Sequence, residues 1–416
     1  MKNIKLSLLG VVSALLLLTA SCNKELEQFP DNNLVTPGTG PKLDQALQTN
    51  PNYSLYYALV VRGGQLSMIS DSTKSFTMFV PGNDGVKQLI SALTGGFIPV
   101  NAPDAVFLGF INSQIPVEQA AVLVQYNTIP QLIKSTSIAP NFPNFFYPSA
   151  FNPMPTASSL LRLGVCPSVI NGAWFNNVPI VHPDELASNG VIHQTLTISI
   201  PGQRTLWDRI ISDTNLTYLK AAVDRADSGA APGTTLKSYL NNEPPNLTVF
   251  SPLTIFAPVD TAFKKILTRL IAQGLIAAGL TPQQAFPIAT QLASTPDVFS
   301  NPALATTLTP TTVKGILAFH VLGTKAYTNN FPTTTTDVPS LLSAFTPHPG
   351  LKITSTFTPP YPFVSGLTVK DTSTNPNSRA ANVIINTMPL TPDPAGTSDQ
   401  DCVNGVLHYI DKVLLP

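Results

Sequence analysis

The feature that most constrains this chain is an internal repeat. Three short sequence patterns occur twice, in the same order, and the spacing between the copies grows along the chain. The pairs are residues 77–81 with 254–258, 122–130 with 315–323, and 189–193 with 404–408. Self-similarity of this kind is typical of a repeated structural unit. The simplest interpretation is two copies of one module, joined near residues 199–203, with longer insertions in the second copy.

Local patterns in the second copy predict strands followed by helices. Residues 247–250 and 253–257 are rich in β-branched and aromatic side chains, which favour strands. After them, apolar side chains recur at helical spacing, which predicts a helix over residues 261–271. Asp260 precedes this helix and is expected to be its N-cap, because a carboxylate accepts the free N–H groups of a first turn. The helical apolar positions are Phe263, Ile266, Leu267, Leu270 and Ile271.

Further elements follow the same logic. Helices are expected over residues 205–212, 215–227 and 311–319, and a strand is expected to begin at His320. Asn404-Gly405 is a tight-turn signal, leading into a strand over residues 406–410. Because strands and helices alternate irregularly, the predicted fold class is α+β.

The N-terminus reads as an export signal. Lys2 and Lys5 precede an apolar run from residue 6 to residue 18, which ends in Thr19-Ala20-Ser21-Cys22. A basic start, an apolar stretch of about 7–15 residues and small residues at the cleavage site define a secretory signal. The run is too short for a bilayer core, which takes about 20 apolar residues. We therefore expect residues 1–21 to be a signal peptide.

The residues at the cleavage site resemble a bacterial lipobox. That resemblance implies that Cys22 is lipidated and anchors the mature chain to a membrane. The alternative is an ordinary secreted protein with a chance cysteine. Asn23, where an aspartate would favour the inner membrane, favours an outer-membrane location, facing either the cell surface or the periplasm. Residues 22–42 are polar and contain prolines and glycines, so we interpret them as a lipidated, flexible tether.

Length and charge limit the remaining possibilities. About 395 mature residues exceed one ordinary domain, so the prediction is one domain over residues 43–200 and a second over 201–416. Charged residues make up only 11% of the chain, with 23 basic and 23 acidic side chains. Nucleic acid is therefore not an expected partner, because phosphate backbones are bound by clustered Lys and Arg.

The repeated patterns resemble the fasciclin (FAS1) domain. The second copy carries three of its motifs in order, in residues 253–263, 316–323 and 404–416, whereas the first copy is more divergent. Together with the lipobox, the chain is similar to fasciclin-domain lipoproteins of Bacteroidetes. The resemblance implies two tandem FAS1-like domains, and it implies structural roles for Pro258, Asp260, Phe263, His320, Asn404, Gly405 and His408.

The histidines show no catalytic pattern. HExxH, GxSxG and nucleotide-binding motifs are absent from the sequence, so no catalytic residue, metal or cofactor is predicted. His193 and His408 occupy equivalent motif positions, and a shared role in bonding backbone groups at a turn is the simpler account. In FAS1 domains the Tyr-His neighbourhood of His320 is linked to adhesion, but here Phe319 replaces the tyrosine and Asn127 replaces the histidine of the first copy.

Other chemistry-bearing residues have two interpretations each. Asp393, Asp399 and Asp401 are interpreted as a solvated loop in preference to a calcium site, since the usual Asp/Asn ladder is missing. Asp224 and Asp227 are placed on a solvent face of their helix, in preference to an acid–base pair. Trp174 is assigned to core packing, with sugar stacking as the alternative. Cys166 and Cys402 are expected to be free, buried thiols, although export permits a disulfide.

These observations favour a binding protein over an enzyme. The leading hypothesis is a non-enzymatic envelope lipoprotein whose two modules serve adhesion or bind an extracellular protein or glycan. Its binding loops would be the Thr/Pro-rich insertions at residues 333–336 and 359–374. The alternative is a glycan-binding accessory lipoprotein of an outer-membrane uptake system. A hydrolase with a non-standard site is a third and weaker possibility.

Overall fold

A computed structural model describes residues 38–416 except 157, 232, 242–251, 345, 359–362, 372–379 and 388–393. Residues Gly38–Pro416 form one compact unit. The signal peptide, Cys22 and the strand expected at residues 247–250 lie outside the described residues. We call residues 43–200 the first module and residues 201–416 the second module; the boundary between them stays a prediction.

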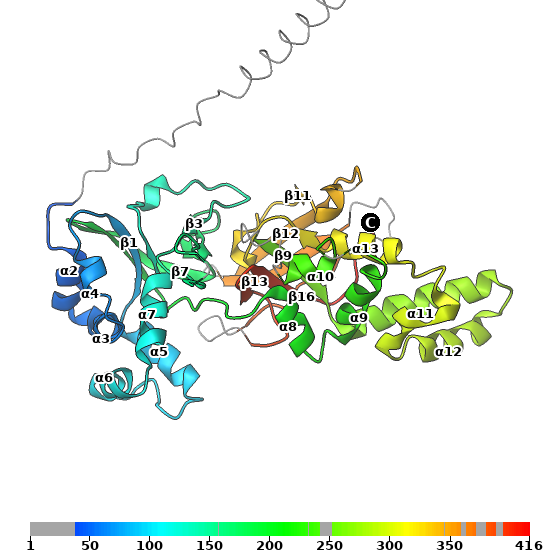
Figure 1. Ribbon diagram of the computed structural model, residues 1–416, viewed down its shortest axis with the longest axis horizontal. Coiled ribbons are helices and arrows are strands. Elements are labelled where there is room, and N and C mark those ends of the chain that lie inside the picture. The colour runs from blue at the N-terminus through cyan, green and yellow to red at the C-terminus, as the bar shows by residue number, and fades with distance from the viewer. Residues whose placement is uncertain are drawn as a thin grey trace, which may run out of the picture. The chain divides into compact units, whose positions relative to one another are not determined.

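The same elements occur in both modules, in the same order (Figure 1). In the first module they are α2 (Leu43–Thr49), α3 (Ser54–Arg62), α4 (Leu66–Ile69), β1 (Phe76–Pro81), α5 (Asn83–Leu93), α7 (Val117–Tyr126), β2 (Thr128–Ile129), β7 (Val178–Ala187) and β8 (Gly190–Thr195). In the second they are α8 (Leu206–Ser212), α9 (Thr217–Ala226), α10 (Leu236–Leu240), β9 (Leu253–Pro258), α11 (Asp260–Ala277), α13 (Pro310–Phe319), β10 (Val321–Leu322), β15 (Gln400–Cys402) and β16 (Gly405–Ile410).

Strand pairing repeats as well. β1 pairs in parallel with β8, and β9 pairs in parallel with β16, in the same register relative to the repeated motifs. On the other side, β2 and β10 join the first strand of each pair antiparallel. The sheet orders β2-β1-β8-β7 and β10-β9-β16-β15 therefore match. The predicted α+β fold is confirmed, and the repeat seen in the sequence is a repeat of topology.

The glycine of each Asn-Gly pair is needed for close packing. Cys402 pairs with Gly405 across the β15–β16 hairpin, so the turn consists of the two residues between them and Gly405 is the first residue of β16. A Cβ atom on Gly405 would overlap the carbonyl oxygen of Leu253 in β9, and one on Gly190 would overlap that of Phe76 in β1. The expected turn exists, but its glycine serves the parallel strand pair.

The predicted helices are present, with buried apolar faces. Phe263, Ile266, Leu267 and Ile271 of α11 are buried, and Leu270 packs against the same cluster. α8 begins after the N-cap Thr205, whose hydroxyl accepts from the backbone N–H of Asp208. His320 is the C-cap of α13, and the strand that follows begins one residue later, at Val321.

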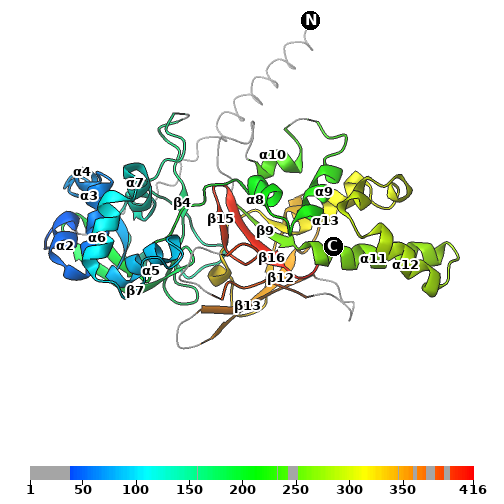
Figure 2. The ribbon, with the colours of Figure 1, turned by 90° about the horizontal axis from the view of Figure 1, so that it is seen from below.

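The two modules differ in their insertions. The second module adds α12 (Pro282–Leu292), which packs beside α11 (Figures 1 and 2), and a sheet of order β11-β12-β13-β14. Its strands are β11 (Thr336–Val338), β12 (Leu351–Thr358), β13 (Phe363–Lys370) and β14 (Ala381–Asn382). The expectation of a binding loop over residues 359–374 is therefore wrong for residues 363–370, whose alternating apolar side chains pack as β13.

The first module has its own additions. They are α6 (Asp104–Ser113), β3 (Tyr147–Pro148), β4 (Gly164–Val165), β5 (Pro167–Ser168) and β6 (Trp174–Phe175). Within the described residues, no single helix is long and apolar enough to cross a membrane. α6 and α7 together reach that length and composition, but they are bent by 111° at their junction.

Candidate functional site

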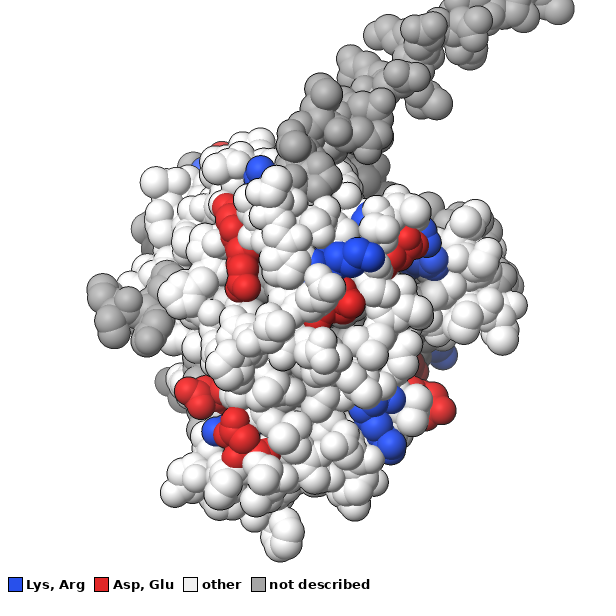
Figure 3. Space-filling view, turned by 90° about the vertical axis from the view of Figure 1, so that its left-hand side faces the viewer, with Lys and Arg blue, Asp and Glu red and all other residues white. Residues whose placement is uncertain are grey.

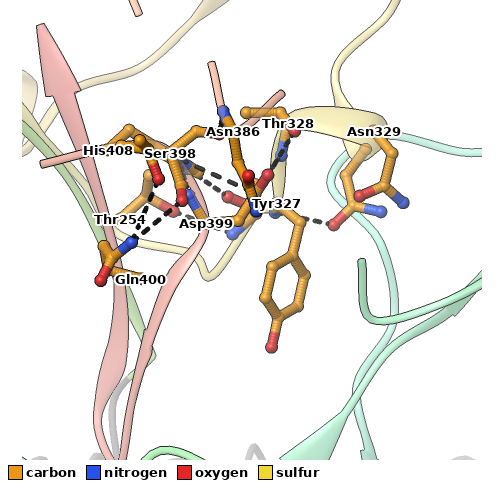
Figure 4. A network of polar contacts seen from close by, with 12 residues as sticks. Thr254, Tyr327, Thr328, Asn329, Asn386, Ser398, Asp399, Gln400 and His408 are labelled. Carbon is orange, nitrogen blue, oxygen red and sulfur yellow. Dashed lines mark hydrogen bonds and ion pairs between the residues drawn. The ribbon is translucent and has the colours of Figure 1, made fainter. Parts of the chain in front are cut away.

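A buried polar cluster of the second module surrounds Asp399, the residue just before β15 (Figure 4). The carboxylate of Asp399 accepts from the backbone N–H of Thr328 (2.7 Å) and from its hydroxyl (2.6 Å). The backbone N–H of Asp399 donates to Nδ1 of His408 (3.1 Å), and Nε2 of His408 donates to the carbonyl of Ala326 (2.8 Å). This histidine thus joins three segments of chain.

The first module contains the same cluster, built from other residues. Asp184, like Asp399, has a left-handed backbone conformation, and its N–H donates to Nδ1 of His193 (3.1 Å). Nε2 of His193 donates to the carbonyl of Ile133 (2.9 Å). Ser135 takes the place of Thr328, since its N–H and hydroxyl both donate to Asp184. His193 and His408 thus make equivalent bonds to backbone groups in the two modules.

Burial fixes the protonation state of these rings. Desolvation lowers the pKa of His193 and of His408, although in each case a nearby carboxylate acts in the opposite direction. Because Nδ1 accepts a backbone N–H, the neutral ring carries its proton on Nε2 and donates it to a carbonyl. Both nitrogens are occupied by backbone groups, so neither ring is positioned to move a proton to or from a substrate.

His320 and Asn127 occupy equivalent positions and make equivalent bonds. His320 donates from Nδ1 to the carbonyl of Ile316 (2.8 Å), and its Nε2 accepts from the N–H of Leu414 (2.9 Å). Asn127 donates to the carbonyl of Leu123 (2.8 Å) and accepts from the N–H of Ser199 (3.1 Å). Each side chain ties the last turn of a helix to the segment that follows the parallel strand.

The position of His320 is incompatible with direct contact to a partner. The side chain is only 2% exposed, and Phe319 is fully buried. Burial lowers the pKa of His320 from 6.5 to about 4, because a buried imidazolium is poorly solvated. The residue linked by resemblance to adhesion is therefore part of the core in this protein.

Asp260 does not cap its own helix. The N-cap of α11 is Val259, and the carboxylate of Asp260 accepts from the hydroxyl of Thr217 (2.6 Å) and the N–H of Tyr218 (3.0 Å) in the first turn of α9. The expectation of a local N-cap was wrong because sequence proximity does not show which helix end lies nearest in space. Asn83 plays the same part for α3 in the first module.

The remaining motif residues lie in the core. Pro258 ends β9 and pairs with Ile410 of β16. Phe263 packs edge-on against Phe299, with ring centroids 6.0 Å apart. Asn404 accepts from the N–H of Leu206 (2.9 Å) and donates to the carbonyl of Leu240 (2.9 Å), so it joins α8 and α10 to the β15–β16 hairpin.

Three aspartates were misplaced by the sequence interpretation. Asp399 and Asp401 do not lie in a solvated loop: Asp399 is buried, and Asp401 in β15 forms an ion pair with Lys325. Asp227 caps α10 by accepting the N–H groups of Leu236 and Lys237. In each case packing brings in a donor from another element or loop of the chain.

This leaves two of the predicted aspartates, Asp224 and Asp393, and the question of a metal site. Asp224 is exposed and pairs with Lys220 (3.0 Å), as expected for a solvent face. Asp393 lies outside the described residues. In the part of the chain that the structure describes, no group of three or more His, Cys, Asp or Glu side chains is arranged to hold a metal ion.

The cysteines are buried free thiols, as predicted. Burial raises the pKa of Cys166 and of Cys402 to about 12, so both stay protonated near neutral pH. On the face shown in Figure 3, the charged side chains of the described residues are scattered among uncharged ones.

A cavity of about 300 Å³ lies where residues of the two modules meet. Trp174 and Asn177 line it from the first module; Thr328, Asn329, Phe363 and Asp399 line it from the second. Trp174 is 2% exposed and donates from its indole N–H to the carbonyl of Asn171 (2.8 Å), so its assignment to packing is confirmed. No pattern in the sequence indicates that this packed tryptophan also borders a cavity with residues far along the chain.

Comparison with known proteins finds one matching family model and a similar solved structure. Residues 232–416 match the model of the Fasciclin domain family. No curated protein matches the chain. Among solved structures, the FAS1 domain pair of the insect cell adhesion molecule fasciclin I is similar, at 12% identity and a TM-score of 0.32, over 88% of this chain and 97% of that chain. The second module is thus similar in sequence to fasciclin domains.

Proposed function

We propose that this chain is a non-enzymatic binding protein of the cell envelope, held at the outer membrane by a lipid on Cys22. Its two fasciclin-like modules would serve adhesion, or bind an extracellular protein or a glycan, as in the fasciclin-domain lipoproteins of Bacteroidetes that it resembles. The export signal, the lipobox-like Thr19–Cys22 and the fasciclin match of residues 232–416 support this proposal.

The proposal rests mainly on how the histidines of the repeated motifs are bonded. His193, His320 and His408 each bond two backbone groups and are buried. Side chains bonded in this way hold a scaffold together and are not available for acid–base chemistry, which requires contact with the reacting group. What a rigid scaffold of this type offers is the surface of its loops and junctions.

The lipid anchor is tested by metabolic labelling with radioactive palmitate in a bacterial host. The wild-type chain should carry label and sediment with membranes, whereas Cys22→Ser should carry none. Asn23→Asp is the matched control, because it leaves the acylated cysteine intact and should retain label while moving toward the inner membrane. Equal labelling of Cys22→Ser and wild type would refute the anchor.

Binding is tested with the chain from residue 23 to 416, which includes the whole compact unit. We expect saturable binding to at least one member of a combined array of extracellular-matrix proteins and glycans. Binding to proteins alone would support adhesion. A blank across the array would refute the proposal of an extracellular binding protein.

A second candidate, the accessory role in glycan uptake, is favoured by one specific observation: the cavity bordered by Trp174. Aromatic side chains beside a polar cavity suit a ligand with both apolar and hydroxyl-bearing faces. Selective binding of glycans in the array, with matrix proteins blank, would favour this candidate over adhesion.

A further inference from the structure

We infer that the cavity bordered by Trp174 and Phe363 binds one neutral sugar residue, either free or at the end of a glycan. This inference deepens the proposed binding function by naming a ligand class for one site. The volume of about 300 Å³ lies at the lower end of ligand pockets, which run from about 300 to 1,000 Å³. A single ring suits such a space better than an extended chain.

The apolar part of the cavity includes two aromatic rings and two aliphatic neighbours, Val364 and Ile385. Trp174 and Phe363 meet edge to face, with ring centroids 6.4 Å apart and planes inclined by 68°. Ile385 borders the same space. Because the C–H face of a sugar ring is apolar, it can pack on such rings while its hydroxyls point elsewhere.

The polar part contains a buried acceptor that lacks a partner. Asn329 is 2% exposed, and its Nδ2 donates to the carbonyl of Asn176 (3.0 Å), which fixes the orientation of the amide. Its Oδ1 is buried and accepts no hydrogen bond within the described part of the chain. Leaving such an atom unsatisfied costs about 1–3 kcal/mol. Asn329 lines the cavity, and a ligand hydroxyl that reached this oxygen would satisfy it.

The charge of the described lining residues disfavours an anionic ligand. No Lys or Arg is among the described residues that line the cavity, and the one charged side chain there is Asp399. Its carboxylate oxygens already accept from the N–H and hydroxyl of Thr328. Phosphorylated or acidic sugars would therefore meet a negative charge with no compensating cation. Neutral hydroxyl groups match the lining.

The fluorescence of Trp174 can be used to follow ligand binding to the cavity. The chain has two tryptophans, and Trp207 in α8 is the other, so Trp207→Phe leaves Trp174 as the sole reporter. The chain from residue 23 to 416 carrying this change would be titrated with glucose, galactose, mannose, N-acetylglucosamine and short neutral oligosaccharides. We expect at least one to change the Trp174 emission saturably. Glucuronate and glucose 6-phosphate should leave it unchanged.

A blocking variant links the signal to the cavity. Thr387 lines the cavity and is exposed, so Thr387→Phe can fill the space without disturbing the core. It should weaken sugar binding at least tenfold. Thr290→Phe, at an exposed position of α12 away from the cavity, is the matched control and should bind as the parent does.

These experiments can refute the sugar site in three ways. Emission unchanged by every neutral sugar, unchanged affinity in Thr387→Phe, or stronger binding of an acidic sugar would each overturn the inference. Failure here leaves the binding-protein proposal standing if the same chain still binds members of the protein and glycan array. If the array is also blank, both fail.

Discussion

Position 127 in the first module and position 320 in the second hold different side chains that make the same connection. Asn127 and His320 both bond a helix carbonyl and the N–H of a segment beyond the last strand. The difference teaches that the position is defined by its bonds, and that a neutral imidazole and an amide both supply them. It also makes only the second module sensitive to acid at this point.

Asp184 and Asp399 show the opposite case, in which the residue is kept and its surroundings change. Both accept from an N–H and a hydroxyl, and both support a histidine. Yet the side chain of Asp184 is 30% exposed, whereas that of Asp399 is 8% exposed and borders the cavity. The same local construction is therefore a surface feature in the first module and part of the cavity wall in the second.

The largest loss of stability is expected at the glycine that both modules have at the start of the second parallel strand. Gly405→Ala and Gly190→Ala each place a methyl group against the backbone of the neighbouring parallel strand. Each should lower the free energy of unfolding by about 3 kcal/mol or more, at the upper end of overpacking costs. Urea denaturation would measure the loss. Gly323→Ala, where the added carbon meets nothing within 4 Å, is the control and should be close to neutral.

The second prediction is that acid destabilises the second module through His320, which has no counterpart of its kind in the first. Because the pKa of His320 is lowered to about 4, the unfolded chain takes up this proton at higher pH than the folded chain does. The stability that the neutral ring contributes is thus complete above pH 6.5 and is lost as pH falls toward 4. His320→Asn should reduce the loss of unfolding free energy between pH 7 and pH 4.5 by about 2.5 kcal/mol.

Urea denaturation at the two pH values checks this expectation. Asn127→His is the reciprocal variant and should add acid sensitivity to the first module. His193 and His408 remain in both variants, so their own titration cancels from the comparison. An acid sensitivity in His320→Asn equal to that of the wild type would show that another group controls the response.

The third prediction sharpens the contrast between the two aspartates. Asp399→Ala leaves the N–H and hydroxyl of Thr328 without acceptors in a buried setting, and should cost about 2 kcal/mol. Asp184→Ala should cost about 1 kcal/mol, because water can replace part of what is lost at the more exposed site. Equal losses in urea denaturation would mean that the difference in burial has no energetic consequence.

Prediction from the sequence succeeded where interacting residues are close together along the chain, and it failed where they are far apart. Helix faces and the strands around residues 254 and 407 followed from spacing within one segment. The equivalence of His193 with His408 followed from the internal repeat. Asp260, Asp227 and Asp399 were misread because their donors come from 9 to 71 residues away. The cavity escaped notice for the same reason, since Trp174 and Asn329 become neighbours only through the packing of one module on the other.

The smallest effect tests whether Asp260 needs its charge. In the first module the neutral Asn83 accepts the N–H of Leu55 (3.1 Å), as Asp260 accepts that of Tyr218. Asp260→Asn should therefore change the free energy of unfolding by less than about 0.5 kcal/mol, while Asp260→Ala should cost about 1 kcal/mol, the usual value of a lost helix cap. Thermal and urea unfolding of both variants would show it. A loss in Asp260→Asn as large as that in Asp260→Ala would mean that charge acting on the first turn of α9, and not the hydrogen bond, is what the second module requires.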